Sequence, residues 1–276
     1  IDARDYGMYL YYFNANSYDN SIRSLVYNNR VHSSSDYGVY FYYADNLKIY
    51  HNSVSATSGY AVRFFNSDNS VVLNNHFKNY RTSANSYVFY TSGSSFDSLD
   101  YNNYMSYSSS DQFYFDGAIA AFAALQAAQP VFNINSYNQE PNFISNSDLH
   151  IDQSVINLRG IRIYDVVNDN DGDVRCLFSP TLGADESYFP TPSPTAVIAS
   201  PDSLYENSPA VFFSAFKPIA GVVLDYTWYL DGVAVDKGRD YKATLATGTY
   251  DLAMTVRSCQ GSDSVSQKIT VKAPTR

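Results

Sequence analysis

Positive charge and cysteine are both scarce in this chain. Its 276 residues include 18 Lys plus Arg against 27 Asp plus Glu, which gives a formal net charge of −9, and only two Cys. Binding to phosphate backbones needs a basic surface, so the composition argues against a nucleic-acid partner. Two thiols cannot form a structural zinc site, and the four His, at positions 32, 51, 76 and 150, show no metal-ligand spacing.

Long apolar runs are also missing. The sequence has no stretch of about 18 apolar residues, so it predicts no membrane-spanning helix. The opening IDARDYGMYL has neither the basic nor the apolar region of a signal peptide. We therefore expect an excised or processed piece of a longer protein.

Aromatic and small polar residues are abundant instead. The 27 Tyr and 17 Phe, together with many Ser, Asn and Asp, favour strands and turns, so all-β structure is expected. One phrase recurs: VYNNRVHSSS from Val26, IYHNSVSATS from Ile49, VLNNHFKNYR from Val72 and, more loosely, DYNNYMSYSS from Asp100. Periods of this length are typical of stacked coils. The sequence therefore predicts a solenoid of short strands.

The recurring amides predict a structural ladder. At a sharp bend, an Asn side chain can hydrogen-bond to the equivalent Asn of the next coil. The apolar residue two positions later should face the core, and in the fourth phrase that residue is Met105. The predicted ladder contains Asn29, Asn52, Asn75 and Asn103.

A second register precedes the amides. YGMYLYY, YGVYFYY and YAVRFFN alternate in apolar character with a period of two. If Val39 and Phe41 point inward, the intervening side chains point outward and align from coil to coil. Such a stripe suits binding to sugar rings or to a protein partner, and the same rings could equally serve only cross-strand packing. The predicted stripe contains Tyr9, Tyr11, Tyr40, Tyr42, Arg63 and Phe65.

The phrase DNDGD offers a candidate cation site. Asp169, Asp171 and Asp173 bring three carboxylates to one Gly turn, and hard cations such as calcium prefer oxygen ligands. The distal Glu of an EF-hand loop is missing. An Asp-rich turn held by hydrogen bonds to Arg175 or to the backbone is the alternative, and the sequence leaves both open.

A Pro-rich stretch then interrupts the pattern. Three Pro fall between positions 190 and 194, which predicts a semi-extended linker. AVFFSAF, LDYTWYLDG, TYDLAMTVRS and SQKITVKA follow as separate strands, with a hairpin turn at Asp231 and Gly232 and with Trp228 as a core anchor. The predicted divisions are a solenoid with its closing segment at 1–188, a linker at 189–196 and a sandwich at 197–276.

These phrases resemble known families. YGVYFYYADNLKIYHNSVSAT is similar to a coil of the right-handed parallel β-helix (pectin-lyase-like) proteins. FDGAIAAFAALQAAQPVFNINSYNQEPNFISNSDLHI, NDNDGDVR and LGADE resemble, in order, the closing segment of large secreted surface proteins of Bacteroidetes. TWYLDGVAV and GTYDLAMTV resemble Ig-like or PKD-like modules. The resemblance implies an all-β fold, a right-handed parallel β-helix followed by a small Ig-like β-sandwich.

Two local expectations accompany this resemblance. The Ig-like modules often pair a Cys near their start with one at the position of Cys259. This chain has Tyr205 in place of the early Cys, so we expect no disulfide in the module and a free thiol at Cys259. From sequence no contact between Cys176 and Cys259 is visible. We also expect Asp116 to cap an Ala-rich helix that ends before Pro130 and packs against the coils.

The functional expectations fall into three classes. The first is a non-catalytic adhesin module of a large secreted surface protein, which binds polysaccharide or other surfaces; the resemblance also implies type IX secretion and gliding motility. The second is a carbohydrate-active enzyme, a lyase or a hydrolase, and the third is a structural spacer. Candidate lyase bases are Lys48, Arg63, Lys78 and Arg81, and candidate glycosidase acids are Asp45, Asp68 and Asp97.

Overall fold

The chain folds into two compact units, Ile1–Ser187 and Tyr188–Arg276. The computed structural model describes residues 1–14, 22–152, 158–176, 178–187, 194–201, 203–214, 225–259 and 261–274. Most of the predicted Pro-rich linker therefore lies outside the described residues.

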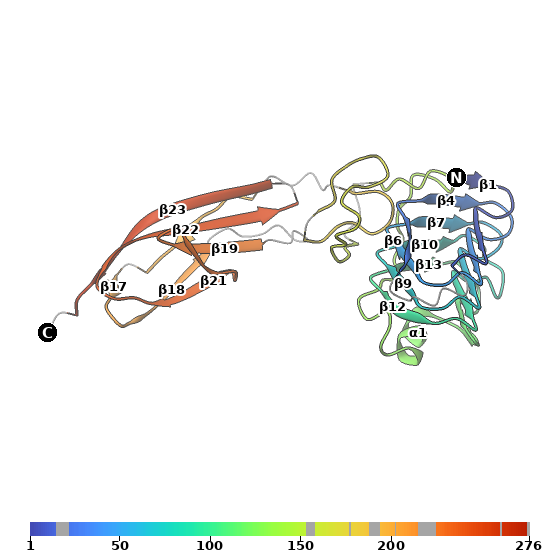
Figure 1. Cartoon of the computed structure of the whole chain (residues 1–276), viewed down its shortest axis with the longest axis horizontal. Coiled ribbons are helices and arrows are strands. Elements are labelled where there is room, and N and C mark those ends of the chain that lie inside the picture. Colours follow the sequence, from blue (N-terminus) through green and yellow to red (C-terminus); the bar gives the residue numbers. More distant parts are fainter. Residues whose placement is uncertain are drawn as a thin grey trace. The chain divides into compact units, whose positions relative to one another are not determined.

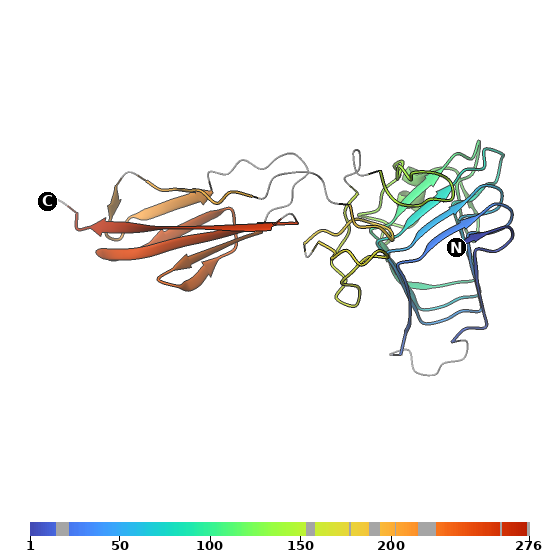
Figure 2. The same ribbon diagram turned by 90° about the horizontal axis from the view of Figure 1, so that it is seen from above.

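Unit 1 is a β-solenoid of about four turns, and each turn adds one strand to each of three parallel sheets. Figures 1 and 2 show the coils stacked as successive layers. The predicted all-β solenoid is confirmed. Sheet A contains β1 (Asp2–Ala3), β4 (Arg30–Ser33), β7 (Ser53–Ala56), β10 (His76–Asn79) and β13 (Asn103–Ser106). Sheet B contains β2 (Met8–Tyr11), β5 (Val39–Tyr42), β8 (Val62–Phe65), β11 (Phe89–Ser92), β14 (Phe113–Phe115) and the antiparallel β15 (Ala118–Ile119). Sheet C contains β3 (Ser24–Tyr27), β6 (Leu47–Tyr50), β9 (Ser70–Leu73) and β12 (Phe96–Asp100).

The core of unit 1 is built from like residues stacked on like. Val39 pairs with Val62, and Phe41 pairs with Phe64 in the same register. The Phe41 and Phe64 rings stack with their centroids 4.5 Å apart, and both side chains are fully buried. Each such side chain contributes roughly 1.5 to 3 kcal/mol when it leaves water. Because a strand buries its inward face only against a neighbouring coil, this repetition holds the stack together.

The amide ladder exists, and its fourth member is Asn102. The side-chain nitrogen of each Asn donates to the side-chain oxygen of the next one, over 2.8 Å from Asn29 to Asn52 and 2.9 Å from Asn52 to Asn75 and from Asn75 to Asn102. The assignment of Asn103 to the ladder is therefore wrong. Asn103 pairs with His76 at the start of the next strand and donates to the Gln139 carbonyl.

The slip of one residue has a local cause. In the earlier coils the left-handed bend residue before the ladder is Asn28, His51 or Asn74, and in the fourth coil it is Tyr101, with φ of 52°. The Asn–Asn pair of the fourth phrase therefore begins one position later in the bend. As a consequence Tyr104, and not Met105, pairs with Phe77 and fills the core.

A short helix, α1 (Phe122–Ala128), packs on the far end of the stack. Leu125 is fully buried in the solenoid core, and Phe122 packs against the same cluster, so the predicted packing against the coils is confirmed. In Figure 1 the helix lies at the end of unit 1 opposite the N-terminus. Asp116 does not cap it: the N-cap is Ala121, and the Asp116 carboxylate accepts the Gly93 N–H over 2.8 Å. Within the described chain, no helix has the length and apolar character needed to cross a membrane.

The described residues of 133–152, 158–176 and 178–187 return along the bends that contain the amide ladder, toward the first coils, and we call them the closing segment. It begins at the fourth coil, where the Asn102 N–H donates to the Ser136 hydroxyl over 3.0 Å. It ends at the first coils, where Arg30 donates to Asp171 over 2.7 Å. Between these points it hydrogen-bonds to outward side chains of sheet A, so the closing segment covers that sheet. The side-chain contacts along the way are Lys78 with Glu140, Ser55 with Asn146 and Ser53 with Ala184.

Unit 2 has two sheets that share one core, and their strand pairs are antiparallel except for one. Trp228 is fully buried in it, as predicted, and donates its indole N–H to the Gly238 carbonyl over 3.0 Å. The predicted hairpin turn at Asp231 and Gly232 is confirmed, since both residues have positive φ and Leu230 pairs with Val233. One sheet contains β16 (Ile198–Ala199), β18 (Pro209–Ser214) and β21 (Asp240–Thr244). The other contains β17 (Leu204–Tyr205), β23 (Gly261–Lys272), β22 (Gly248–Ser258), β19 (Asp225–Leu230) and β20 (Val233–Asp236), where β17 joins β23 in parallel.

Neither cysteine is a free thiol, because Cys176 and Cys259 are both disulfide-bonded. The expected free thiol at Cys259 is therefore wrong. The expectation came from the missing Cys within the module, and a partner distant in the sequence leaves no local pattern that could reveal it.

The ladder makes a stability prediction. Asn75→Ala removes donors to the Ile49 and Leu73 carbonyls and to Asn102. It also removes the oxygen that accepts the backbone and side-chain N–H groups of Asn52 in a buried bend. We expect a loss of about 2 to 4 kcal/mol in the free energy of unfolding, measured by urea denaturation. Asn29→Ala, at the half-buried end of the ladder, is the matched control and should lose less. Equal losses for the two variants would contradict a ladder that depends on its buried members.

Candidate functional site

The outward residues of sheet B form stacked columns, in the predicted alignment. Tyr9 pairs with Tyr40 and Tyr40 pairs with Arg63, while Tyr11, Tyr42 and Phe65 align beside them. The Tyr9 and Tyr40 rings stack at 5.1 Å and 14°, and the Tyr42 and Phe65 rings at 5.4 Å and 5°. We call these six residues the aromatic stripe.

The structure extends the stripe in two directions that the sequence analysis missed. The column of Tyr40 and Arg63 continues through Tyr90 to Tyr114. The Tyr90 and Tyr114 rings stack with their centroids 4.4 Å apart. A further column begins before each strand, where the Tyr37 and Tyr60 rings lie 5.2 Å apart. The signal for this column was present in the sequence, because a Tyr precedes the small or apolar residue that opens each sheet B phrase.

The stacking decides which part of each ring faces solvent. Within a column, each ring covers the face of its neighbour, so solvent meets ring edges and hydroxyl groups. Exposure falls from 44% at Tyr9 and 60% at Tyr11, in the first coil, to 7% at Tyr40. Burial raises the pKa of Tyr40 to about 12, although the nearby Arg63 guanidinium opposes this. The stripe is thus a stacked array whose tyrosines are most exposed in the first coil.

Arg63 lies inside this array. Its guanidinium carbon is 4.7 Å from the centre of the Tyr40 ring and 5.1 Å from that of Tyr90, within cation–π range of both. It also donates to the Tyr37 hydroxyl over 2.8 Å. A guanidinium keeps its proton in proteins, so Arg63 is a poor general base and suits a structural or binding role.

The other candidate bases have partners. Lys48 donates to Asp165 over 2.8 Å, and the buried Lys78 donates to Glu140. The Arg81 guanidinium donates to the Ser83 hydroxyl over 2.6 Å. The two lysine contacts fix the closing segment to coils, and the arginine contact lies within the loop that follows β10.

The candidate acids also serve the coils. Asp45 accepts the backbone N–H of Asp68 over 2.8 Å, and Asp68 accepts the Ser95 hydroxyl over 2.7 Å. Asp97 forms an ion pair with Arg23. These three carboxylates lie in separate contacts, with no pairing between Asp97 and the other two among the contacts of the described residues.

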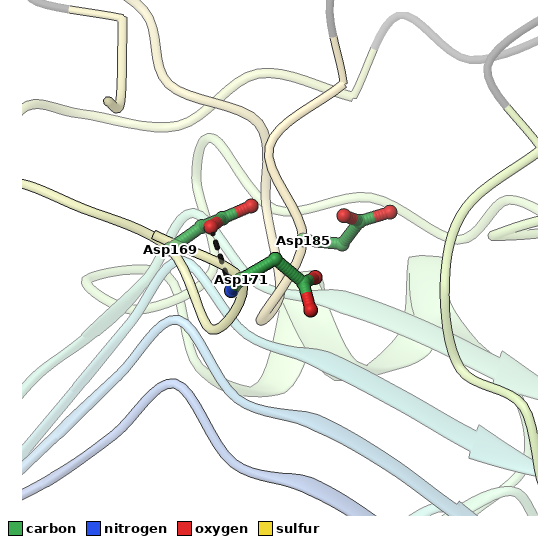
Figure 3. A group of neighbouring side chains, drawn as sticks. All are labelled: Asp169, Asp171 and Asp185. Atoms are coloured by element: carbon green, nitrogen blue, oxygen red, sulfur yellow. Dashed lines mark hydrogen bonds between the residues drawn. The ribbon is translucent and has the colours of Figure 1, made fainter. Parts of the chain in front are cut away.

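Tertiary folding assembles a different acidic group. Asp169, Asp171 and Asp185 place carboxylate oxygens within 4.8 Å of one another, as Figure 3 shows, and we call them the acidic cluster. Asp185 comes from the LGADE phrase and takes the place that the sequence analysis gave to Asp173. Oxygens this close could share one calcium ion, which binds its ligands at about 2.3 to 2.6 Å.

The hydrogen bonds of the cluster favour the turn interpretation. Asp169 accepts the backbone N–H groups of Asp171 and Asp173, each over 2.9 Å, and that of Glu186 over 2.8 Å. Asp171 is paired with Arg30, whose guanidinium lowers the pKa of that carboxyl. A cation would therefore have to compete with Arg30 and with three backbone donors.

The acidic cluster lies beside an open depression of about 810 Å³. His150 is its basic group and contacts Asp148 and, over 3.4 Å, Asp171. Burial raises the pKa of Asp185, which lines the same depression. Three separate stretches of the closing segment meet here, so spacing along the chain gave no sign of it. The remaining lining residues are Ile144, Ile151, Asp152 and Asp173.

One family comparison bears on this architecture. Residues 4–118 match the description "Right handed beta helix region". These residues are a right-handed β-helix region. The predicted hand of the solenoid is thereby confirmed, and the match covers the coils that carry the aromatic stripe and the ladder. No curated protein matches the chain.

Two buried histidines beneath the closing segment make stability sensitive to acid. Burial lowers the pKa of His76 to about 3 and lowers that of His51, to which the Arg175 guanidinium also contributes. Below the usual pKa of about 6.5 the unfolded chain takes up these protons and the folded chain does not. As the pH drops below 6.5, each of the two histidines should therefore lower the free energy of unfolding by about 1.4 kcal/mol per pH unit.

The measurement compares the wild type with His76→Gln by urea denaturation between pH 7 and 5. Glu186 acts in the opposite direction, because burial raises its pKa to about 7, and it is common to both proteins. The variant should lose less stability toward pH 5 than the wild type. Parallel stability curves for the two proteins would contradict the prediction, because they would show that His76 titrates alike in the folded and the unfolded state.

The turn interpretation of the acidic cluster predicts that Asp169 stabilises the protein without calcium. Asp169→Ala removes the acceptor of three backbone N–H groups, so it should lower the melting temperature by a similar amount in calcium and in EDTA. A calcium-dependent rise in melting temperature that Asp171→Asn and Asp185→Asn both abolish would overturn the turn interpretation and establish a calcium site.

Proposed function

We propose that this protein is a non-catalytic adhesin module, part of a large secreted surface protein, that contacts polysaccharide or another extracellular surface. The right-handed β-helix region supports this at a coarse level, because the fold is found in both adhesins and carbohydrate-active enzymes. The choice between these classes rests on the aromatic surface of sheet B and on the ion pairs and ring contacts that hold the candidate catalytic residues.

The observation that carries the proposal is the preorganised aromatic stripe. Its rings are held in columns by the coils beneath, so they lose little conformational freedom when a ligand binds. Its four tyrosines place hydroxyl groups at an interval of about one strand spacing, and Tyr9 and Tyr11 of the first coil are 44% and 60% exposed. Sheet A has no comparable surface, since the closing segment covers it.

The partners of the candidate catalytic groups support the non-catalytic choice. Lys48 and Lys78 are held in ion pairs, and Arg63 is enclosed by rings. A base that is committed to an ion pair must break that contact before it can take a proton. The groove candidates are thus parts of the scaffold.

An extracellular location fits the covalent structure. Disulfides persist mainly in oxidising compartments, and both cysteines of this chain are disulfide-bonded. The resemblance of the closing segment to Bacteroidetes surface proteins supports secretion, cell-surface display and the rest of a longer protein as the immediate partner. Type IX secretion and a role in gliding adhesion belong to the same proposal.

The test replaces exposed rings and spares the buried ones. Tyr9→Ala with Tyr11→Ala removes two stripe side chains that are 44% and 60% exposed, so folding should be little affected. Tyr27→Ala, a 45% exposed tyrosine on sheet C of the same coil, is the matched control. In pull-down assays with cellulose, chitin, alginate and pectate, the double variant should lose about tenfold in affinity or more for the polysaccharide that the wild type binds, or about 1.4 kcal/mol.

An unchanged affinity of the double variant, or an equal loss in Tyr27→Ala, would refute the stripe as the binding surface. If the wild type binds none of these polysaccharides and no cell surface, the structural spacer becomes the better interpretation.

A carbohydrate-active enzyme is the second candidate, and the depression beside the acidic cluster favours it. Burial raises the pKa of Asp185, and Arg30 lowers that of Asp171. Opposite shifts in neighbouring carboxyls are what general acid and general base work requires. Release of reducing ends or unsaturated uronates by the wild type, lost in Asp185→Asn and retained in Asp45→Asn, would decide for this candidate.

A further inference from the structure

Among the described residues, the strands of the first coil are paired on one side only, at one end of the solenoid. β1, β2 and β3 are the edge strands of sheets A, B and C, and each is bonded on one side to the second coil. Edge strands present alternate N–H and C=O groups that lack partners, and they are templates for a further strand. At the other end α1 and the start of the closing segment cover the core.

The amide ladder stops at this end with an open position. The Oδ1 atoms of Asn52, Asn75 and Asn102 each accept two hydrogen bonds, from the backbone and side-chain nitrogens of the Asn one coil earlier. Among the described residues, no donor reaches the Oδ1 of Asn29. A donor pair in the position of an earlier Asn would complete the series.

The core and the stripe are open at the same place. Met8, Leu10 and Val26 are half-buried, whereas the residues that pair with them one coil later, Val39, Phe41 and Ile49, are at most 4% exposed. The Tyr9 and Tyr11 rings stack on Tyr40 and Tyr42 of the next coil and remain 44% and 60% exposed. Among the described residues, the strand edges, the Asn29 amide, the core side chains and the rings of the first coil therefore all lack a neighbouring coil on the same side.

We propose that this end is a docking surface for one further β-coil of the same repeat, in parallel register. The partner is specified by its chemistry: an Asn over Asn29, aliphatic or aromatic side chains over Met8 and Leu10, and rings over Tyr9 and Tyr11. The docking surface continues the interface that joins each coil to the next, and the repeat already shows which groups fill each of these positions.

A second copy of the chain fits this surface less well. The far end of the copy is covered by α1, so only its own first coil could meet the surface. Two first coils that meet end to end, related by a two-fold axis, run in opposite directions. Antiparallel pairing cannot reproduce the evenly spaced hydrogen bonds of the parallel coils or the single-direction amide ladder.

The experiment supplies the missing coil from the chain itself. Asp2 pairs with His32 and His32 pairs with Ser55, so Ile1 occupies the position that Val31 and Val54 hold in the next coils. A second copy of residues 31–53, fused directly before Ile1, would therefore place its Asn52 over Asn29. The control is the same fusion with Phe41→Asp and Asn52→Asp in the added copy alone.

Amide hydrogen exchange of Met8–Tyr11 and Ser24–Tyr27 provides the readout. We expect exchange in these strands to slow by about tenfold or more in the fusion and to remain near the unmodified rate in the control. If the fusion does not fold, as judged by circular dichroism, a synthetic peptide of residues 31–53 added to the unmodified protein should slow the same amides. Unchanged exchange in the folded fusion, or with the peptide when the fusion does not fold, would overturn the proposal. So would a concentration-dependent dimer of the unmodified protein that protects these amides.

Discussion

Parallel pairing of each coil with the next, in fixed register, is the constraint on which the rest of this structure depends. A four-residue strand with one apolar face cannot bury that face by itself. Stacked about 4.8 Å above an equivalent strand, it gains backbone hydrogen bonds, an apolar neighbour and a ring or amide partner together. The core, the ladder and the aromatic stripe are three consequences of this one interaction.

Because the register fixes every position, a single surface property is repeated along the solenoid. An outward Tyr in one coil stands beside the outward residue of the next, and so the chain builds columns from isolated tyrosines. The same register places the only cation of the stripe, Arg63, between two rings. Columns of this kind are stiff, which suits a binding surface and also determines that ring edges, and not ring faces, meet solvent beyond the first coil.

The closing segment gives unit 1 a second level of organisation. Its backbone groups at Asn146 and Ala184 and the Glu140 side chain bind outward groups of sheet A. The segment also buries His51 and His76, so one side of the solenoid is occupied. The acidic cluster is a product of this arrangement, since Asp169 and Asp185 meet only where the segment folds back on itself. Sheet B is left as the aromatic surface, and the first coil as the open end of the stack.

The sequence by itself determined the solenoid, the alignment of Tyr9 with Tyr40 and of Tyr40 with Arg63, three of the four ladder residues, and Trp228 as the core of unit 2. These features follow from local periodicity, which can be read directly from the order of residues in the chain. The fourth ladder residue was misplaced, because Tyr101 takes a bend position that Asn or His holds elsewhere and the phrase alone does not show the shift. Only the tertiary structure decided that Asp185 and not Asp173 completes the acidic cluster, that Lys48 and Lys78 are held in ion pairs, and that both cysteines are in a disulfide. Such contacts join residues far apart in the chain, so no period or spacing encodes them, and they exist only once the coils have set the surface on which the closing segment lies.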